Sequence, residues 1–169
     1  MATSFRRYFL YHIFISAAAF CIGRIVPKSW FKYDAFPFHS FAFEKGGKLY
    51  ERLGIKKWQT RIPDMSRIFT GIMPPKNLQG AYAQRLPIMI QETCIAECTH
   101  EMLCIFSLFG LTLWDSPLRF ALTAFYILVL NLPYILVQRY NRPRLLRIWK
   151  RTQHCPACDT SPIAAEAPV

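Results

Sequence analysis

Two apolar runs constrain the fold of this chain more than any other feature of its sequence. The first, YFLYHIFISAAAFCIGRIV at residues 8–26, is broken only by His12 and, near its end, by Arg24. The second occupies residues 102–137, with WDSPLR at residues 114–119 as a polar break. A membrane helix needs about 20 apolar residues, so the first run predicts one crossing and the second predicts a helical hairpin with two.

The N-terminal run has a second interpretation. Arg6 and Arg7 precede its apolar core and small residues follow, a pattern that is also typical of a secretory signal. The apolar stretch continues to Val26, beyond any small-residue cleavage site. This continuation favours a membrane helix.

Composition and charge agree with a one-domain membrane protein. The 169 residues are 53% hydrophobic and 18% charged, and the formal charge of +11 suits anionic headgroups or phosphate-bearing substrates. We expect membrane lipids as partners and no nucleic acid, because a soluble nucleic-acid reader would have no place for the apolar runs. The expected fold is mainly α-helical, with about three membrane helices in a single domain of residues 1–153 and a flexible tail of residues 154–169.

The distribution of cations predicts the orientation of the chain in the cell membrane. Eleven Lys and Arg residues lie within residues 28–85 and six within residues 139–151. By the positive-inside tendency, the long loop and the C-terminal segment share the cytoplasmic side, and the N-terminus lies outside. The loop is rich in aromatic residues and Lys and has Gly46 and Gly47 at a turn, so we expect it to be folded against the membrane face.

The segment QETCIAECTHEM, residues 91–102, is the strongest candidate for chemistry. In a helix, the spacing of Thr93, Glu97 and His100 places them on one face, with Glu101 one turn beyond Glu97. A carboxylate beside an imidazole can fix its tautomer and raise its basicity, as a general base for a hydroxyl requires. The alternative is a polar helix end whose side chains are simply solvated. Ionisable residues at the mouth of an apolar helix favour the functional interpretation.

Cysteine usage gives little support for a metal or a cofactor, and we expect neither. Cys94, Cys98 and Cys104 lie near His100, but cysteine is also a common small buried residue. The tail motif HCPACD, residues 154–159, contains one CxxC, which is half of a zinc site or a redox pair.

A cationic segment, VQRYNRPRLLRIWKRTQ at residues 137–153, follows the most apolar part of the chain. Pro143 is expected to end or kink the third helix and so to keep these cations at the interface. Together with FAFEKGGKLYERLGIKKW (residues 41–58) and IQETCIAECTH (residues 90–100), this segment resembles the glycosyl-4,4'-diaponeurosporenoate acyltransferase family, which completes staphyloxanthin-type carotenoid pigments. The resemblance covers roughly residues 31–151, and QRYNRPRL is its most specific part.

The resemblance implies a small membrane O-acyltransferase. Such an enzyme esterifies a sugar hydroxyl of a lipophilic glycosylated acceptor, a C30 carotenoid, with a fatty acyl chain from acyl-CoA or acyl carrier protein. The family's ET..AE..H pattern is matched by Glu92, Thr93, Ala96, Glu97 and His100.

No Gly-x-Ser-x-Gly elbow is present, so we expect direct transfer to the hydroxyl. In this hypothesis His100 takes the proton and Glu97 orients the imidazole. Asn141, with Arg139 or Arg142, faces the oxyanion or the phosphates of the donor. The candidate catalytic residues are His100, Glu97, Glu92 and Thr93, and the candidate substrate-binding residues are Arg139, Asn141, Arg142, Arg144, Glu44 and Lys45.

Two other functions stay open at this point. A different lipid-modifying enzyme, acting on a glycolipid or a polyprenyl sugar, would keep all of these residues. A membrane subunit of a lipid or pigment pathway would keep the apolar helices and the basic face, but it would not need Glu97 and His100.

Overall fold

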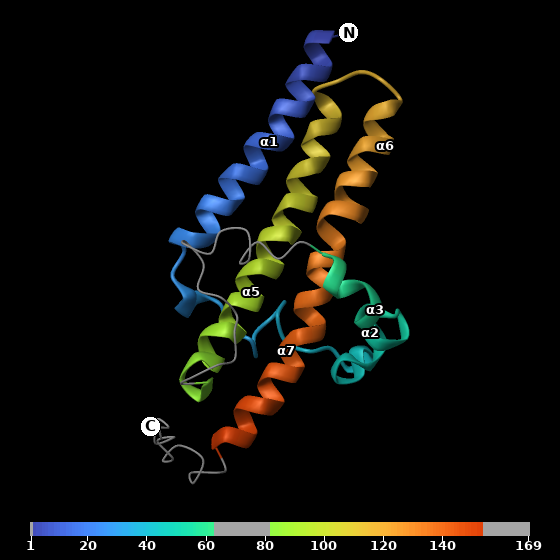
Figure 1. The fold of residues 1–169 in the computed structure, drawn as a ribbon. Coiled ribbons are helices and arrows are strands. Elements are labelled where there is room, and N and C mark those ends of the chain that lie inside the picture. Colours follow the sequence, from blue (N-terminus) through green and yellow to red (C-terminus); the bar gives the residue numbers. More distant parts are fainter. Residues whose placement is uncertain (1, 63–81, 154–169) are drawn as a thin grey trace, which may run out of the picture.

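Three long helices lie side by side in the computed structural model, which describes residues 2–62 and 82–153 (Figure 1). The tail with its CxxC, Cys155 and Cys158, lies outside the described residues. Every regular element within the described ranges is helical. The long elements are α1 (Ala2–Ile25), α5 (Tyr82–Ser107, extended by a 3-10 segment, Leu108–Thr112), and a third rod made of α6 (Leu118–Phe125), a π-helical segment (Tyr126–Asn131) and α7 (Leu132–Gln153).

In Figure 1, α1 lies beside the upper part of α5 and of the third rod, and these two extend further down the molecule. The N-terminus lies at one end, whereas the end of α7 lies at the other. Three stretches are long and apolar enough to cross a membrane, namely Thr3–Ile25, Arg85–Thr112 and Leu118–Gln153. The prediction of a mainly α-helical chain with about three such helices is confirmed.

The predicted start of the second long helix is wrong, and of the two outcomes expected at Pro143, an end or a kink, the structure excludes the end. The second long helix begins at Tyr82 rather than at Met102, so residues 91–102 lie inside the helix and not at its mouth. Pro143 does not end the third helix, which continues to Gln153. At the start of α5, polar side chains made the sequence look interrupted, but Glu92, Thr93 and Glu97 are paired within the fold. At Pro143 the helix continues although the proline removes one backbone donor.

The outer surface of the long helices is apolar. Phe14 of α1, Phe109 after α5 and Leu128 of the π-helical segment are each more than half exposed. By contrast, Thr123 and Asn131, in the same part of the third rod, are buried. Apolar groups outside and polar groups between helices suit a lipid environment, where polar contacts between helices replace the hydrophobic effect.

Polar contacts also attach α1 to the rest of the fold. The Tyr8 hydroxyl lies 2.9 Å from Thr123 Oγ1, and Ser16 Oγ lies 2.8 Å from the Tyr126 hydroxyl. The His12 ring packs against Gly110, where an added Cβ would come within 2.6 Å of a ring carbon. The first helix is therefore an integral part of the described fold.

The segment after α1, residues 26–62, is folded as expected and is called the loop below. It contains two short α-helices, α2 (Lys48–Arg52) and α3 (Ile55–Trp58), and three 3-10 segments, Lys28–Trp30, Ala42–Gly47 and Gln59–Arg61. Gly47 and Gly54 precede α2 and α3 with φ values of 101° and 70°, a backbone conformation that side chains oppose. Tyr50 and Ile55 of the loop form a buried cluster with Tyr140 of α7, and this cluster anchors the loop to the third rod.

Candidate active site

Four charged side chains meet where α5, α7 and the loop come together. Glu44 comes from the loop, Glu97 from α5, and Arg139 and Arg142 from α7; their side-chain exposed fractions are 1%, 0%, 11% and 2%. The two carboxylates balance the charges of the two guanidinium groups. Charges buried to this extent are tolerated only where they are paired and hydrogen-bonded. We call this set the ion-pair network.

Arg139 connects the loop to α5. Its Nε donates to Glu44 Oε1 at 2.6 Å, and its Nη1 donates to Glu97 Oε1 and to the Pro37 carbonyl. The guanidinium carbon lies 4.8 Å from the centroid of the Phe41 ring, within the range of a cation–π contact. This arginine therefore fixes the position of the loop on the helices.

Glu44 is also held by its own segment. The Tyr50 hydroxyl donates to Oε1 at 2.6 Å, and the Phe41 backbone N–H donates to Oε2 at 3.0 Å. Burial, and then the hydrogen bond to Glu44, raise the pKa of Tyr50 above its ordinary value. The hydroxyl thus keeps its proton and remains a donor to the carboxylate.

All three nitrogens of the Arg142 guanidinium donate hydrogen bonds within the fold. Its Nε donates to Thr93 Oγ1 at 2.9 Å, its Nη2 donates to Glu97 Oε2 and to the Thr93 carbonyl, and its Nη1 donates to the Phe38 carbonyl. The Thr93 hydroxyl in turn donates to the Ile90 carbonyl at 2.6 Å. Thr93 and Glu97, two residues of the predicted face of α5, are therefore acceptors for an arginine.

These contacts bear on the expected role of the two arginines. The sequence predicted that Arg139 and Arg142 face an oxyanion or the phosphates of a donor. In the structure their N–H groups already have acceptors on Glu44, Glu97 and the backbone. The geometry therefore favours a structural role, in which they hold α7, α5 and the loop together.

The structure pairs His100 with Asn131 and not, as the sequence predicted, with Glu97. His100 Nδ1 lies 2.9 Å from Asn131 Oδ1, whereas the oxygens of Glu97 face Arg139 and Arg142. A guanidinium is permanently charged and presents several donors, so it is a better partner for a buried carboxylate than an imidazole is. Because the two arginines bind Glu97, His100 forms its hydrogen bond with a different residue.

The contact with Asn131 decides which ring nitrogen of His100 carries the proton. Asn131 Nδ2 donates to the Tyr126 carbonyl at 2.9 Å, so Oδ1 faces the imidazole and can only accept. Nδ1 of His100 is therefore the donor, and Nε2 keeps a lone pair. The ring also stacks on Tyr134, with 4.6 Å between centroids. The result is an imidazole held in one orientation by Asn131, the last residue of the π-helical segment, and such segments are frequent at functional sites.

We call the face where α5 and α7 meet the seam. It comprises Thr93, Glu97 and His100 on the first helix, facing Arg142, Arg139 and Asn131 on the third rod.

The other predicted site residues lie outside these pairs. Glu92 forms an ion pair with Lys28, at 2.9 Å, where α1 passes into the loop. Arg144 and Lys45 are exposed, and Asn141 is half-buried. The structure therefore brings together only part of the predicted set.

Asn131 is the partner of His100 that sequence reasoning missed, and the site residues Tyr134 and Tyr50 were also not predicted. The signal for Asn131 was its position in LVLNLP, where an amide interrupts a strongly apolar stretch and needs a hydrogen-bond partner. The carbonyl acceptors of Pro37 and Phe38 have no such signal, because every residue carries a carbonyl.

No metal site is found in the part of the chain that the structure describes. Within residues 2–62 and 82–153, no three His, Cys, Asp or Glu side chains are grouped as metal ligands would be. Cys94, Cys98 and Cys104 are free thiols.

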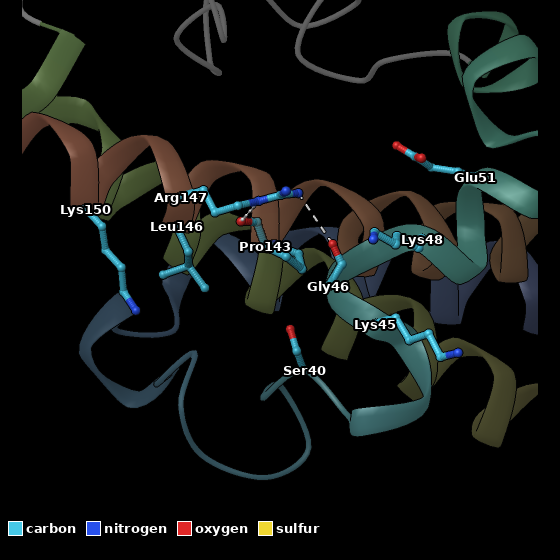
Figure 2. Close-up of a pocket in the computed structure, with 9 residues that line it drawn as sticks. All are labelled: Ser40, Lys45, Gly46, Lys48, Glu51, Pro143, Leu146, Arg147 and Lys150. Carbon is cyan, nitrogen blue, oxygen red and sulfur yellow. Dashed lines mark hydrogen bonds between the residues drawn. The ribbon is translucent and has the colours of Figure 1, made fainter.

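A hollow of about 360 Å³ lies between α7 and the loop (Figure 2). Arg147 bridges its two sides by donating to the carbonyls of Pro143 and Gly46 at 3.3 and 3.4 Å. Glu51, also at the hollow, pairs with Lys56 at 2.9 Å, and this hydrogen bond lowers the pKa of Glu51. The residues that line the hollow are Ser40, Lys45, Gly46, Lys48, Glu51, Pro143, Leu146, Arg147 and Lys150.

Comparisons with known proteins agree on one family. Residues 27–151 match the family model described as glycosyl-4,4'-diaponeurosporenoate acyltransferase. Two relatives with this name, from Staphylococcus aureus strains bovine RF122 / ET3-1 and N315, are each 33% identical over 136 residues, which is 77% of this chain and 80% of the relative. No solved structure matches the chain.

Proposed function

Because the chain belongs to the glycosyl-4,4'-diaponeurosporenoate acyltransferase family, we propose that it is a membrane enzyme that transfers a fatty acyl group to a sugar hydroxyl of a glycosylated C30 carotenoid. Family membership makes the chain an acyltransferase of carotenoid biosynthesis, which argues against a subunit without activity. The observation that carries the proposed site is the hydrogen bond between His100 and Asn131, since it leaves an oriented base inside a helical seam.

The proposed reaction is a direct transfer from a thioester. The sugar hydroxyl lies with its proton toward Nε2 of His100, and its oxygen attacks the acyl carbonyl carbon while Nε2 takes the proton. Asn131 accepts from Nδ1–H and keeps the imidazolium in place. The C–S bond then breaks, the imidazolium returns the proton to the leaving thiolate, and the products are the ester and a free thiol.

In this proposal the ion-pair network positions the base. Glu97 precedes His100 by three residues on α5, and it is tied to α7 through Arg139 and Arg142. A catalytic side chain must be held within a fraction of an ångström to act well, and such support comes from rigid neighbours. The network supplies this rigidity close to His100 without touching the substrate.

The proposed location is the cell membrane, with three crossings and with the loop and the end of α7 on the cytoplasmic side. The three long apolar helices and the cations of the loop and α7 support it. To test it, single Cys residues replace Lys57 or Arg151 in a background without native Cys. A membrane-impermeant thiol reagent should label both from the cytoplasmic side, and labelling from opposite sides would contradict the proposal.

The activity is tested by expressing the chain with a glycosylated C30 carotenoid and a pool of acyl-CoA, and by analysing the lipid extract by mass spectrometry. We expect an acyl ester on the sugar that is missing from cells without the chain. Acylation of a different glycolipid alone would replace the proposed acceptor. Folded, membrane-inserted protein that gives no acylated product would contradict the proposal.

A further inference from the structure

Three cations at the hollow between α7 and the loop, Lys45, Lys48 and Arg147, have no acidic partner among the described residues. Within the described ranges, neither Lys45 nor Lys48 forms an ion pair. Glu51 is the carboxylate at the hollow, and Lys56 already pairs with it from outside. A cavity whose lining carries an excess of positive charge raises the local concentration of a negatively charged ligand. The ligand expected here is an anion.

The cations of the hollow differ from those of the ion-pair network in whether an acidic side chain already balances their charge. Arg139 and Arg142 donate hydrogen bonds to two carboxylates and to backbone carbonyls. Arg147 makes only carbonyl contacts, both longer than 3.2 Å, so its charge is not balanced by an acid. The anion-binding capacity of this region therefore lies in the hollow.

The size and lining of the hollow fit a ligand with phosphate groups and a less polar part. Its volume of about 360 Å³ lies within the range of small-molecule clefts, about 300–1,000 Å³. Leu146 and Pro143 form an apolar wall on α7, and Figure 2 shows Lys45 and Lys150 extending at opposite ends of the view. A single inorganic anion would leave most of this space empty.

The position of the hollow along α7 relates it to His100. Pro143 lies twelve residues beyond Asn131, the partner of His100, and at 1.5 Å per residue this corresponds to about 18 Å along the rod. The pantetheine arm of coenzyme A, which links the phosphates to the thioester, is an extended chain of similar reach. Phosphates in the hollow would therefore allow the thioester to lie at the level of the imidazole.

We infer that the hollow binds the phosphate groups of coenzyme A and is the donor site of the acyl transfer. The inference rests on the proposed function, because it names the donor for the same reaction. It assigns donor recognition to Lys45, Lys48 and Arg147 rather than to the buried arginines.

The test measures coenzyme A binding by calorimetry, with the purified full-length protein in nanodiscs of phosphatidylcholine. The double variant Lys45→Ala/Lys48→Ala should bind about tenfold more weakly, as expected for the loss of two partly screened charges. Lys57→Ala is the matched control, since it removes an exposed lysine of α3 outside the hollow, and it should bind like the parent. Binding by the parent should weaken as salt is added.

Two further arms identify what the hollow recognises. Pantetheine, which lacks the phosphates, should not distinguish the double variant from the parent. Nanodiscs that contain phosphatidylglycerol test the headgroup alternative. If the double variant loses affinity for that lipid but binds coenzyme A as the parent does, the hollow is a lipid site and the inference is overturned.

The outcomes separate this inference from the proposed function, because calorimetry needs no acyl transfer. Protein that binds coenzyme A through the hollow but makes no ester contradicts the proposed function alone. Protein that makes the ester, and whose parent and double variant bind coenzyme A equally or not at all, contradicts the inference alone.

Discussion

The seam and the hollow take cations from the same stretch of α7 but place them in opposite environments. In the seam, Arg142 is 2% exposed and pairs with Glu97. One and a half turns later, Arg147 is exposed at the hollow and has no carboxylate partner among the described residues. A run of arginines in one helix is therefore not one functional unit.

The two environments also predict different consequences of mutation. Removing one member of a buried ion pair leaves an uncompensated charge in a medium of low dielectric constant, which is costly. Removing an exposed cation costs little stability, because water already screened it. Variants of the seam should therefore change folding or the chemical step, and variants of the hollow should change ligand affinity.

The largest effect is expected for Arg142→Ala. It leaves Glu97 buried with one arginine fewer, at a cost of about 3–5 kcal/mol, which is a large part of the 5–15 kcal/mol that typically stabilises a domain. We expect loss of folded protein, measured as a lower melting temperature in detergent. Arg151→Ala is the control, since it removes an exposed cation of the same helix and should change stability by less than about 0.5 kcal/mol. Equal melting of the two variants would contradict the distinction.

Next in size is the effect of His100→Ala on the rate of ester formation. Removal of a general base should slow the reaction by about a hundredfold to ten-thousandfold with the protein still folded. Asn131→Ala removes one orienting hydrogen bond, of about 1 kcal/mol, and should cost about tenfold or less. The double variant should be barely slower than His100→Ala, because the two residues act as a unit.

Rates are normalised to the amount of extracted, folded protein, which separates chemistry from stability. A well-folded His100→Ala variant that acylates at the parent rate would place the base elsewhere. The seam would then be structural throughout.

A smaller effect is expected for Tyr50→Phe at the edge of the ion-pair network. It removes the 2.6 Å hydrogen bond to the buried carboxylate of Glu44, a loss of about 1.5–3 kcal/mol in denaturant or thermal unfolding. Tyr33→Phe, in the same loop but outside the network, should have little effect. A similar loss of stability in both variants would show that the hydrogen bond from Tyr50 to Glu44 does not stabilise the fold in particular.

The same tyrosine predicts a pH dependence. Because its pKa is raised in the fold, the unfolded chain releases this proton first, and stability should decline as pH rises above the ordinary tyrosine pKa of about 10. Tyr50→Phe should lack this component of the decline. If the stability of the variant declines with pH as steeply as that of the parent, Tyr50 is not the source of this pH dependence.

The smallest effect is expected for Glu51→Gln at the hollow. It removes a carboxylate beside the proposed phosphate site, although Lys56 already balances part of its charge. Coenzyme A should therefore bind only a few-fold more tightly, within the range of about 1 kcal/mol for exposed charges. Weaker binding by this variant would mean that Glu51 contacts the ligand through a hydrogen bond instead of repelling it.

Much of the fold could be predicted because its signals are local. The apolar run at residues 8–26 and the polar break at residues 114–119 correspond to α1 and to the turn before α6. Helix boundaries near polar residues could not be predicted from local hydrophobicity, because the pairing of those residues depends on distant parts of the chain. The start of α5 was misplaced because the apolar count stopped at residues that the fold later buries and pairs.

The site was predictable only as a set of residue types. Helical spacing correctly placed Thr93 and Glu97 on one face of α5, since that relation depends only on the geometry of a single helix. It could not say that Glu97 would face Arg139 and Arg142, because these residues are more than forty positions away. It also gave no reason to join Asn131 to His100.

Three apolar helices, a folded aromatic loop and an excess of cations near the loop and the end of α7 could be inferred from the sequence, because each is a property of composition within a short window. Which of these charges are neutralised depends on the packing of the helices and the loop. Glu44 reaches Arg139 across 95 positions of sequence, and the packing of the loop on α7 brings them to 2.6 Å. Partners for a buried charge are chosen by proximity and by competition among donors, and neither exists until the helices have packed.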